Sequence, residues 1–162
     1  MEVKIRPLEE NDANTSVKWR NDPEIWSHTA FSATKNVSVD DELKWIRTVI
    51  ADASCRRFAI LADDKYIGNI YLTNIAAGEA EYSIFIGEKS YWGKGVARKA
   101  SEQIIDYARK TLKLKSVKLG VSEDNLAAVR LYKSLNFKEF SRDNRFNWMR
   151  LDLKDWRDHE EK

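Results

Sequence analysis

A glycine turn between an apolar strand and a long helical pattern constrains this chain more than any other feature. The turn reads Tyr91-Trp92-Gly93-Lys94-Gly95-Val96-Ala97-Arg98, and the helical pattern covers roughly Lys94 to Thr111. At the start of a helix, unbonded backbone N–H groups and the helix dipole together attract an anion. Glycine has no side chain to keep that anion at a distance. The segment therefore predicts a pyrophosphate site in a fold that mixes strands and helices.

Gly93-Lys94-Gly95 does not match the two common phosphate-binding sequences. A dinucleotide fingerprint requires a third glycine three positions after the second, where this chain has Arg98. A P-loop requires four residues between its glycines and then Gly-Lys-Ser/Thr, which the segment lacks. Taken alone, a Gly-x-Gly turn before a helix is more often a simple turn, so other features have to decide whether this one binds a pyrophosphate.

Composition narrows the classes of protein that remain. With 43% hydrophobic and 33% charged residues among 162, the chain is typical of one folded domain, residues 1–162. The net charge of +2 gives no reason to expect nucleic-acid binding, and no apolar run approaches the ~20 residues that span a bilayer. One cysteine and two histidines exclude an internal disulfide and argue against a metal site. We therefore expect no metal, no nucleic-acid or membrane partner and a cytoplasmic location.

Hydrophobic periodicity predicts an α/β (α+β) fold of three layers, with a mixed, mostly antiparallel sheet of about seven strands flanked by helices. Glu10-Asn11-Asp12 caps a helix that runs to about Asn21, and Ser38 with Asp41 forms a capping box before a second helix. Strands are predicted at Val3 to Pro7, Arg57 to Ala62, Tyr66 to Leu72, Glu79 to Gly87, Ser116 to Val121, Phe137 to Phe140 and Arg145 to Leu153. A last helix covers Asn125 to Leu135.

Three features together carry a resemblance to a known family. The glycine turn follows the strand Tyr82-Ser83-Ile84-Phe85-Ile86-Gly87, and Asn125-x-x-Ala128-x-x-x-Tyr132 lies further along the chain. With Gly95 and Ala97 these segments resemble the GNAT acetyltransferase superfamily, whose signature is Gln/Arg-x-x-Gly-x-Gly/Ala. Trp92 departs from that signature, and Tyr-Trp-Gly-x-Gly resembles the branch of ribosomal-protein N-terminal acetyltransferases.

The resemblance implies that residues 79–137 form an acetyl-CoA-binding core. The amides of Trp92, Gly93, Lys94, Gly95, Val96, Ala97 and Arg98 would hold the pyrophosphate, while Ile84, Phe85 and Ile86 would pair with the pantetheine arm as an added strand does. Asn125 and Ala128 would form the second CoA element, although Asn125 also suits a helix N-cap. Tyr132 would donate a proton to the departing thiolate; its alternative is a core aromatic residue.

The acceptor side is less determined by the sequence. We expect Glu81 to act as the base that deprotonates the attacking amine, with Glu79 nearby; the alternative for Glu81 is a solvated charge at a strand end. Residues 1–55 are expected to form a lid of helices. A Trp-Arg-Asn segment there resembles acetyltransferases acting on nucleotide-linked amino sugars, which implies acceptor contacts from Trp19, Arg20, Trp26 and His28. The alternative makes Trp19 a core residue and Arg20 a surface ion pair.

The expected function is transfer of an acetyl group from acetyl-CoA to a primary amine of a small molecule, with a nucleotide-linked amino sugar as the first candidate. N-terminal acetylation of a ribosomal protein and acetylation of a polyamine are the enzymatic alternatives. A catalytically silent CoA-binding module is the alternative of a different class. The family resemblance also leaves a homodimer open.

Overall fold

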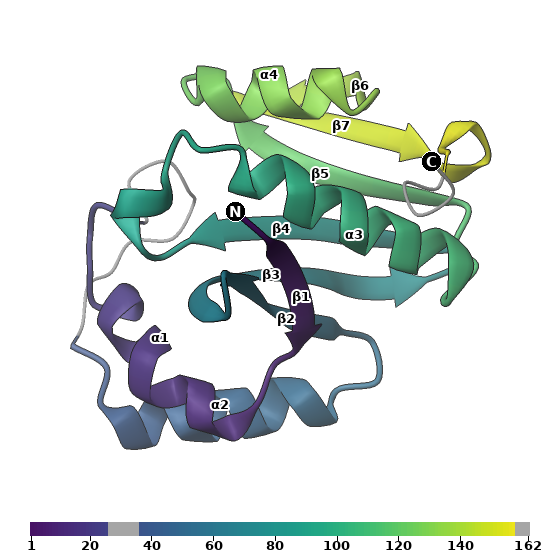
Figure 1. Ribbon diagram of the computed structural model, residues 1–162. Helices are drawn as coiled ribbons and strands as arrows, with labels where there is room; N and C mark the ends of the chain where they lie inside the picture. Colours follow the sequence, from purple (N-terminus) through teal and green to yellow (C-terminus); the bar gives the residue numbers. More distant parts are fainter. Residues whose placement is uncertain (26–35, 158–162) are drawn as a thin grey trace.

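A computed structural model describes residues 1–25 and 36–157 of the chain. Its strands form one sheet in the order β1-β2-β3-β4-β5-β7-β6, in which only β4 and β5 pair in parallel (Figure 1). The strands are β1 (Val3–Pro7), β2 (Arg56–Ala62), β3 (Lys65–Ala76), β4 (Glu79–Ile86), β5 (Ser116–Ser122), β6 (Lys138–Asp143) and β7 (Phe146–Asp152). The predicted seven-stranded, mostly antiparallel sheet is confirmed, and β3 extends beyond its predicted end at Leu72.

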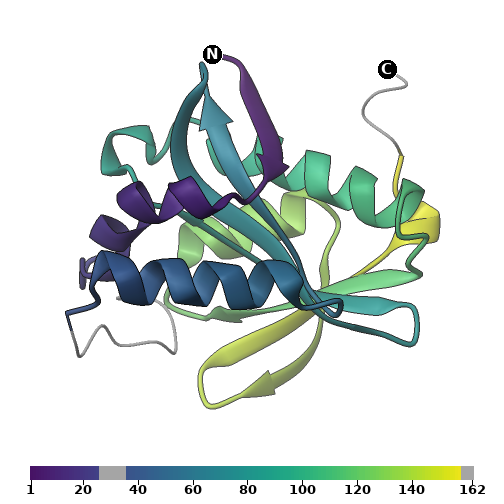
Figure 2. The same cartoon turned by 90° about the horizontal axis from the view of Figure 1, so that it is seen from below.

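Helices cover both faces of this sheet and make three layers (Figures 1 and 2). The helices are α1 (Ala13–Arg20), α2 (Val39–Ala51), α3 (Val96–Lys110) and α4 (Leu126–Ser134). Side chains alternate along a strand, so adjacent residues of β2 serve different cores. Ile60 packs into the large core under α3 and α4, whereas Ala59 packs with Ile46 of α2 in a smaller core on the opposite face.

Helix starts follow the predicted local chemistry. The Asp41 amide donates to the Ser38 hydroxyl at 3.0 Å, and the Ser38 amide donates to the Asp41 carboxylate at 3.4 Å, so the capping box before α2 is present. Three acidic residues in the first turn of α2 also stabilise the helix, because their negative charges interact favourably with the positive end of its dipole. Within the part of the chain that the structure describes, no helix is long and apolar enough to cross a membrane.

The parallel pair in the middle of the sheet is the feature that positions the site. β4 and β5 pair only over residues 79–81 and 116–118, and beyond that point the two strands diverge (Figure 1). Glu79 fastens the closed end: its carboxylate accepts from Arg150 Nε of β7 at 2.7 Å and from the Ser116 hydroxyl of β5 at 2.7 Å. The consequence is an opening in the sheet whose narrow end is held by an ion pair.

Candidate active site

A cleft of about 540 Å³ occupies the opening between the diverging strands, and we refer to it as the β4–β5 cleft. It is lined by Tyr71 of β3, residues 81–85 of β4, residues 119–122 of β5, Asn125, Ala128 and Tyr132 of α4 and its cap, and Asp143, Asn144, Phe146 and Trp148 of the β6–β7 hairpin. These residues come from six elements, several of them far apart in sequence, so only the fold brings them together.

The cleft is lined from both faces of the sheet. Tyr82 of β4 points toward the helices, where its hydroxyl is hydrogen-bonded to Ser101 of α3. Its neighbours on the strand, Glu81 and Ser83, lie on the opposite face by strand alternation. Phe85 lies on the same face as Glu81 and Ser83, and its ring contacts Trp19 of α1. The arrangement therefore allows one reactant to enter from the α3–α4 face and a second to enter from the other.

Tyr132 lies on the helix face of the cleft, within an aromatic cluster. Its ring centroid is 5.7 Å from that of Tyr82 at 85° and 5.8 Å from that of Phe137, and only 8% of the residue is exposed. Burial raises the pKa of Tyr132 to about 12, partly offset by its hydrogen bond with Tyr82. The two readings of the sequence are thus compatible, since Tyr132 is packed in the core and also lines the cleft. At neutral pH it is a protonated phenol that can donate a proton.

The glycine turn lies at the start of α3 as the sequence predicted. Gly93 and Gly95 have φ of +73° and +79°, values that L side chains rarely adopt, and an added Cβ at either would meet no atom within 4 Å. The first helical bond runs from the Lys99 amide to the Gly95 carbonyl at 3.3 Å. The amides before Lys99 consequently have no acceptor within the helix, and the open space beside Gly93 and Gly95 leaves room for an anion to approach the turn.

Side chains around the turn hold it in place and add positive charge. Trp92 donates from its indole Nε1 to the Ile86 carbonyl at 2.8 Å, which ties the turn to the end of β4. Arg98 donates to the Ser134 hydroxyl at 2.6 Å and thereby joins α3 to α4. The first turn of α3 contains no acidic residue. The turn can therefore bind a pyrophosphate through its amides while Trp92 serves a structural purpose.

Both ends of α4 are capped, and Asn125 is the N-cap that the sequence predicted. Asn125 accepts a hydrogen bond from the Ala128 amide at 3.2 Å and also lines the cleft, so it caps the helix next to the site. Asn136 follows the helix with φ of +74°, and the Phe137 amide donates to the Tyr132 carbonyl at 3.0 Å. Because both caps fix the helix, Tyr132 is held at a defined height beside β4.

The two predicted acceptor-side carboxylates occupy different places. Glu81 lines the cleft and accepts a hydrogen bond from the Asn74 amide group. Glu79 lies at the closed end of the cleft, where the hydrogen bond from Arg150 holds the pKa of its carboxyl below the usual range despite partial burial. Lys118 is also within 3.5 Å of that carboxylate. Glu79 is thus engaged in joining three strands, whereas Glu81 lines the cleft itself.

The prediction that Trp19 contacts the acceptor needs correction, because the ring is a core residue, as the alternative expected. Only 4% of Trp19 is exposed, its ring packs against Tyr66 and Phe85, and Gly87 leaves the space that its indole fills. A ring enclosed in this way has no free face for a ligand. Arg20 donates from Nη2 to Glu42 Oε1 at 3.2 Å, so it has a buried carboxylate partner, as the ion-pair alternative expected.

Trp26 and His28 lie outside the described residues. Sequence reasoning missed several lining residues on the acceptor side, among them Tyr71, Gly120, Ser122, Asp143, Asn144, Phe146 and Trp148. The alternation of side chains along β7 could have pointed to Trp148. Met149 and Leu151 face the core, so Trp148 must lie on the opposite face of the sheet.

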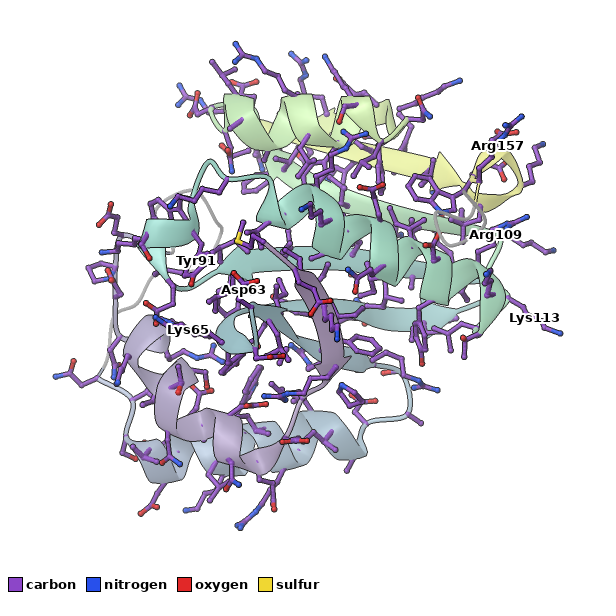
Figure 3. All side chains as sticks on the ribbon, viewed as in Figure 1. Asp63, Lys65, Tyr91, Arg109, Lys113 and Arg157 are labelled. Atoms are coloured by element: carbon purple, nitrogen blue, oxygen red, sulfur yellow. The ribbon has the colours of Figure 1, made fainter. Side chains whose placement is uncertain are left out.

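A second hollow, of about 580 Å³, lies at the opposite end of α3 from the glycine turn. Arg109 and Lys113 lie there (Figure 3), together with Lys115 and Lys154. Positive charges near a helix C-terminus interact favourably with the negative end of the helix dipole, which accounts for part of this cluster. Among the described residues, no three His, Cys, Asp or Glu side chains gather in a way that could hold a metal ion.

Comparison with known families identifies the architecture. The model of the acetyltransferase (GNAT) domain matches residues 2–138 of this chain. The chain belongs to the GNAT acetyltransferase family. It is 30% identical over 129 residues to acetyltransferase PseH of Campylobacter jejuni, covering 80% of this chain and 78% of that protein. It is 31% identical over 140 residues to spermidine N(1)-acetyltransferase of Escherichia coli, covering 83% and 72%.

A solved structure agrees with this assignment. Spermidine N-acetyltransferase of Vibrio cholerae, in complex with CoA and spermine, superimposes with a TM-score of 0.83 at 27% identity and covers 94% of this chain and 96% of that one. The superfamily resemblance is thereby confirmed, and the chain is an N-acetyltransferase. The relatives named here are not ribosomal-protein acetyltransferases, so the finer resemblance stays a prediction.

Proposed function

We propose that the enzyme transfers an acetyl group directly from acetyl-CoA to the primary amine of a small molecule within the β4–β5 cleft. The observation that supports this most strongly is the pairing of groups across the cleft. A buried, protonated Tyr132 lies on the helix face, and the Glu81 carboxylate lies on the opposite face. An acid and a base separated in this way suit a reaction in which a thiolate leaves on one side and an amine attacks from the other.

The residues that would hold acetyl-CoA are those of the turn and of β4. The amides from Gly93 to Arg98 would bind the pyrophosphate, with Lys94 adding charge nearby. Because β5 pairs with β4 only up to Glu81, the edge of residues 84–86 is open for hydrogen bonds to the pantetheine arm, except at the Ile86 carbonyl, which already accepts from Trp92. Asn125 and Ala128 would border the same arm from α4.

Each catalytic group then has one task. Glu81 accepts a proton from the ammonium form of the acceptor, because only the neutral amine can attack the thioester carbonyl. Tyr132 donates its phenolic proton to the sulfur as the carbon–sulfur bond breaks, and the second proton, which the nitrogen releases as the amide forms, passes through solvent and restores the phenol. Tyr82, whose pKa burial raises well above its usual value, stays neutral and orients Tyr132 through their hydrogen bond. No covalent acyl-enzyme is needed.

The lining of the cleft favours an amino sugar as the acceptor. Ser83, Ser122 and Asn144 offer neutral hydrogen-bonding groups for hydroxyls, and the aromatic rings on the same side suit the apolar face of a sugar ring. Among the described residues that line the cleft there is no Lys or Arg, so the diphosphate of a nucleotide-linked sugar would lie outside this lining.

A polyamine is the second candidate. Within residues 1–25 and 36–157, the charged residues of the lining are the acidic Glu81 and Asp143, which suit a substrate with several positive charges. The similarity to spermidine acetyltransferases favours the same reading. N-terminal acetylation of a protein rests on the Tyr-Trp-Gly-x-Gly resemblance alone. A cytoplasmic location and a homodimer remain predictions.

Release of CoA from acetyl-CoA, measured against a panel of acceptors, tests the proposal. The panel contains a free amino sugar, its nucleotide-linked form, spermidine and a short peptide with a free N-terminus. Turnover of either sugar supports the first candidate, and turnover of spermidine alone supports the second. Turnover of the peptide alone contradicts a small-molecule acceptor. Binding of acetyl-CoA without turnover of any amine would contradict the proposal in favour of a silent CoA-binding module.

A further inference from the structure

Gly120 and Trp148 face each other across the acceptor side of the cleft. Gly120 of β5 and Trp148 of β7 are direct partners in the antiparallel register. A Cβ built on Gly120 would lie 3.2 Å from Cη2 and 3.3 Å from Cζ3 of Trp148, closer than nearly all real Cβ contacts. The indole therefore lies across the bare backbone of Gly120, and both residues line the cleft.

The backbone conformation at position 120 does not require glycine, whereas the space taken by the Trp148 indole does. Gly93 and Gly95 of the turn have positive φ, but Gly120 does not, so an alanine could adopt its backbone conformation. What an alanine could not do is leave the indole where it is. Glycine in a strand interior commonly marks a place where another group approaches the backbone closely.

The indole also has an unused hydrogen-bond donor. Trp92 and Trp156 donate from Nε1 to protein acceptors. Among the described residues, Trp148 Nε1 has no such acceptor, and it is not one of the buried unpartnered side-chain atoms. Its N–H consequently has no partner among the described residues and is not fully buried, so it is available to donate to a ligand.

We propose that Trp148, seated on Gly120, is the residue that sets the size of the acceptor. This inference rests on the proposed function, since it assumes that the amine enters from the Glu81 face. The flat indole limits the width of the group that can approach, its face contacts a sugar ring or an ammonium group, and its N–H binds a hydroxyl. Gly120 determines how far the indole recedes from the acceptor.

A double-mutant cycle tests the pair in the full-length enzyme. Steady-state KM values for acetyl-CoA and for each active acceptor are measured for wild type, Gly120→Ala, Trp148→Ala and the double variant. Gly120→Ala displaces the indole into the cleft, so we expect the acceptor KM to rise about tenfold while the acetyl-CoA KM stays unchanged. Trp148→Ala should accept bulkier amines. In that background Gly120→Ala should change nothing, because the added methyl group meets no ring.

Several outcomes separate this inference from the proposed function. An unchanged acceptor KM in Gly120→Ala, or an equal effect of Gly120→Ala in both backgrounds, would overturn the role of the pair while the proposed function stands. Failure of the wild-type enzyme to acetylate any amine would overturn both. Thermal unfolding checks that each variant is folded. Trp148→Phe, which keeps a ring but loses the N–H, replaces the truncation if Trp148→Ala unfolds, and should weaken hydroxylated acceptors most.

Discussion

Gly95 and Gly78 offer a matched comparison that isolates the pyrophosphate site. Both glycines have φ of +79°, but Gly95 begins α3 whereas Gly78 lies in the turn between β3 and β4. A Cβ on Gly95 would meet nothing within 4 Å, and one on Gly78 would make ordinary contact with the Lys115 side chain at 3.4 Å. Replacing either glycine by alanine therefore introduces the same backbone strain and no serious clash in the free protein.

Stability and cofactor binding should separate in these two variants. A left-handed alanine costs roughly 1–2 kcal/mol, and for a chain of this size each kcal/mol lowers the melting temperature by about 2–4 °C. Both variants should lose a similar few degrees. Only in Gly95→Ala does the methyl group occupy the space where the phosphate must approach the amides. Loss of one charge-assisted hydrogen bond costs about 1.5–3 kcal/mol, which weakens acetyl-CoA binding about 10- to 100-fold.

Isothermal titration calorimetry with acetyl-CoA and differential scanning calorimetry measure the two effects. The expected result is equal destabilisation of both variants with a raised Kd only for Gly95→Ala. If Gly95→Ala binds acetyl-CoA as tightly as Gly78→Ala, the phosphate does not lie on this turn and the reasoning is wrong.

Three further predictions concern the catalytic groups. Tyr132→Phe should lower kcat by about 10²-fold or more while the Kd for acetyl-CoA measured by calorimetry is kept, and an unchanged kcat would remove the acid role. Glu81→Gln should lower kcat by a similar factor of about 10²-fold. Where a water chain takes the place of the carboxylate as the base, this loss of kcat should be largest at low pH. Unchanged turnover would assign the base to another group. Because burial raises the folded-state pKa of Tyr132 to about 12, the unfolded chain loses its proton first as the pH rises above about 10. The free energy of unfolding should therefore fall between pH 10 and 12 by about 2 kcal/mol more in wild type than in Tyr132→Phe, and equal denaturation curves would contradict the burial argument.

Local features of the fold could be predicted because their causes are local. The capping box of Ser38 and Asp41, the glycine turn before α3 and the left-handed Asn136 each depend on residues that are neighbours in sequence. The same holds for the helix face that carries Tyr132. Spacing and residue type suffice at this level, since backbone conformation and capping act over only a few residues.

Features that depend on pairing between distant segments could not be predicted. The divergence of β4 from β5 follows from a register of three residue pairs and from the contact between Glu79 and Arg150, which are 71 positions apart. The same limitation affected Trp19. Its sequence neighbours suggested an exposed lid, but the space above Gly87 encloses its ring. Trp148 enters the cleft only because β7 pairs with β5.

The most direct test of the central claim is a crystal structure of the enzyme with CoA and the acceptor that the panel identifies. The account predicts pyrophosphate oxygens within hydrogen-bond distance of the amides from Gly93 to Arg98. It also predicts the CoA sulfur next to the Tyr132 hydroxyl and the acceptor amine on the side of Glu81. A CoA sulfur remote from Tyr132, or an acceptor that enters from the same face as CoA, would contradict the account.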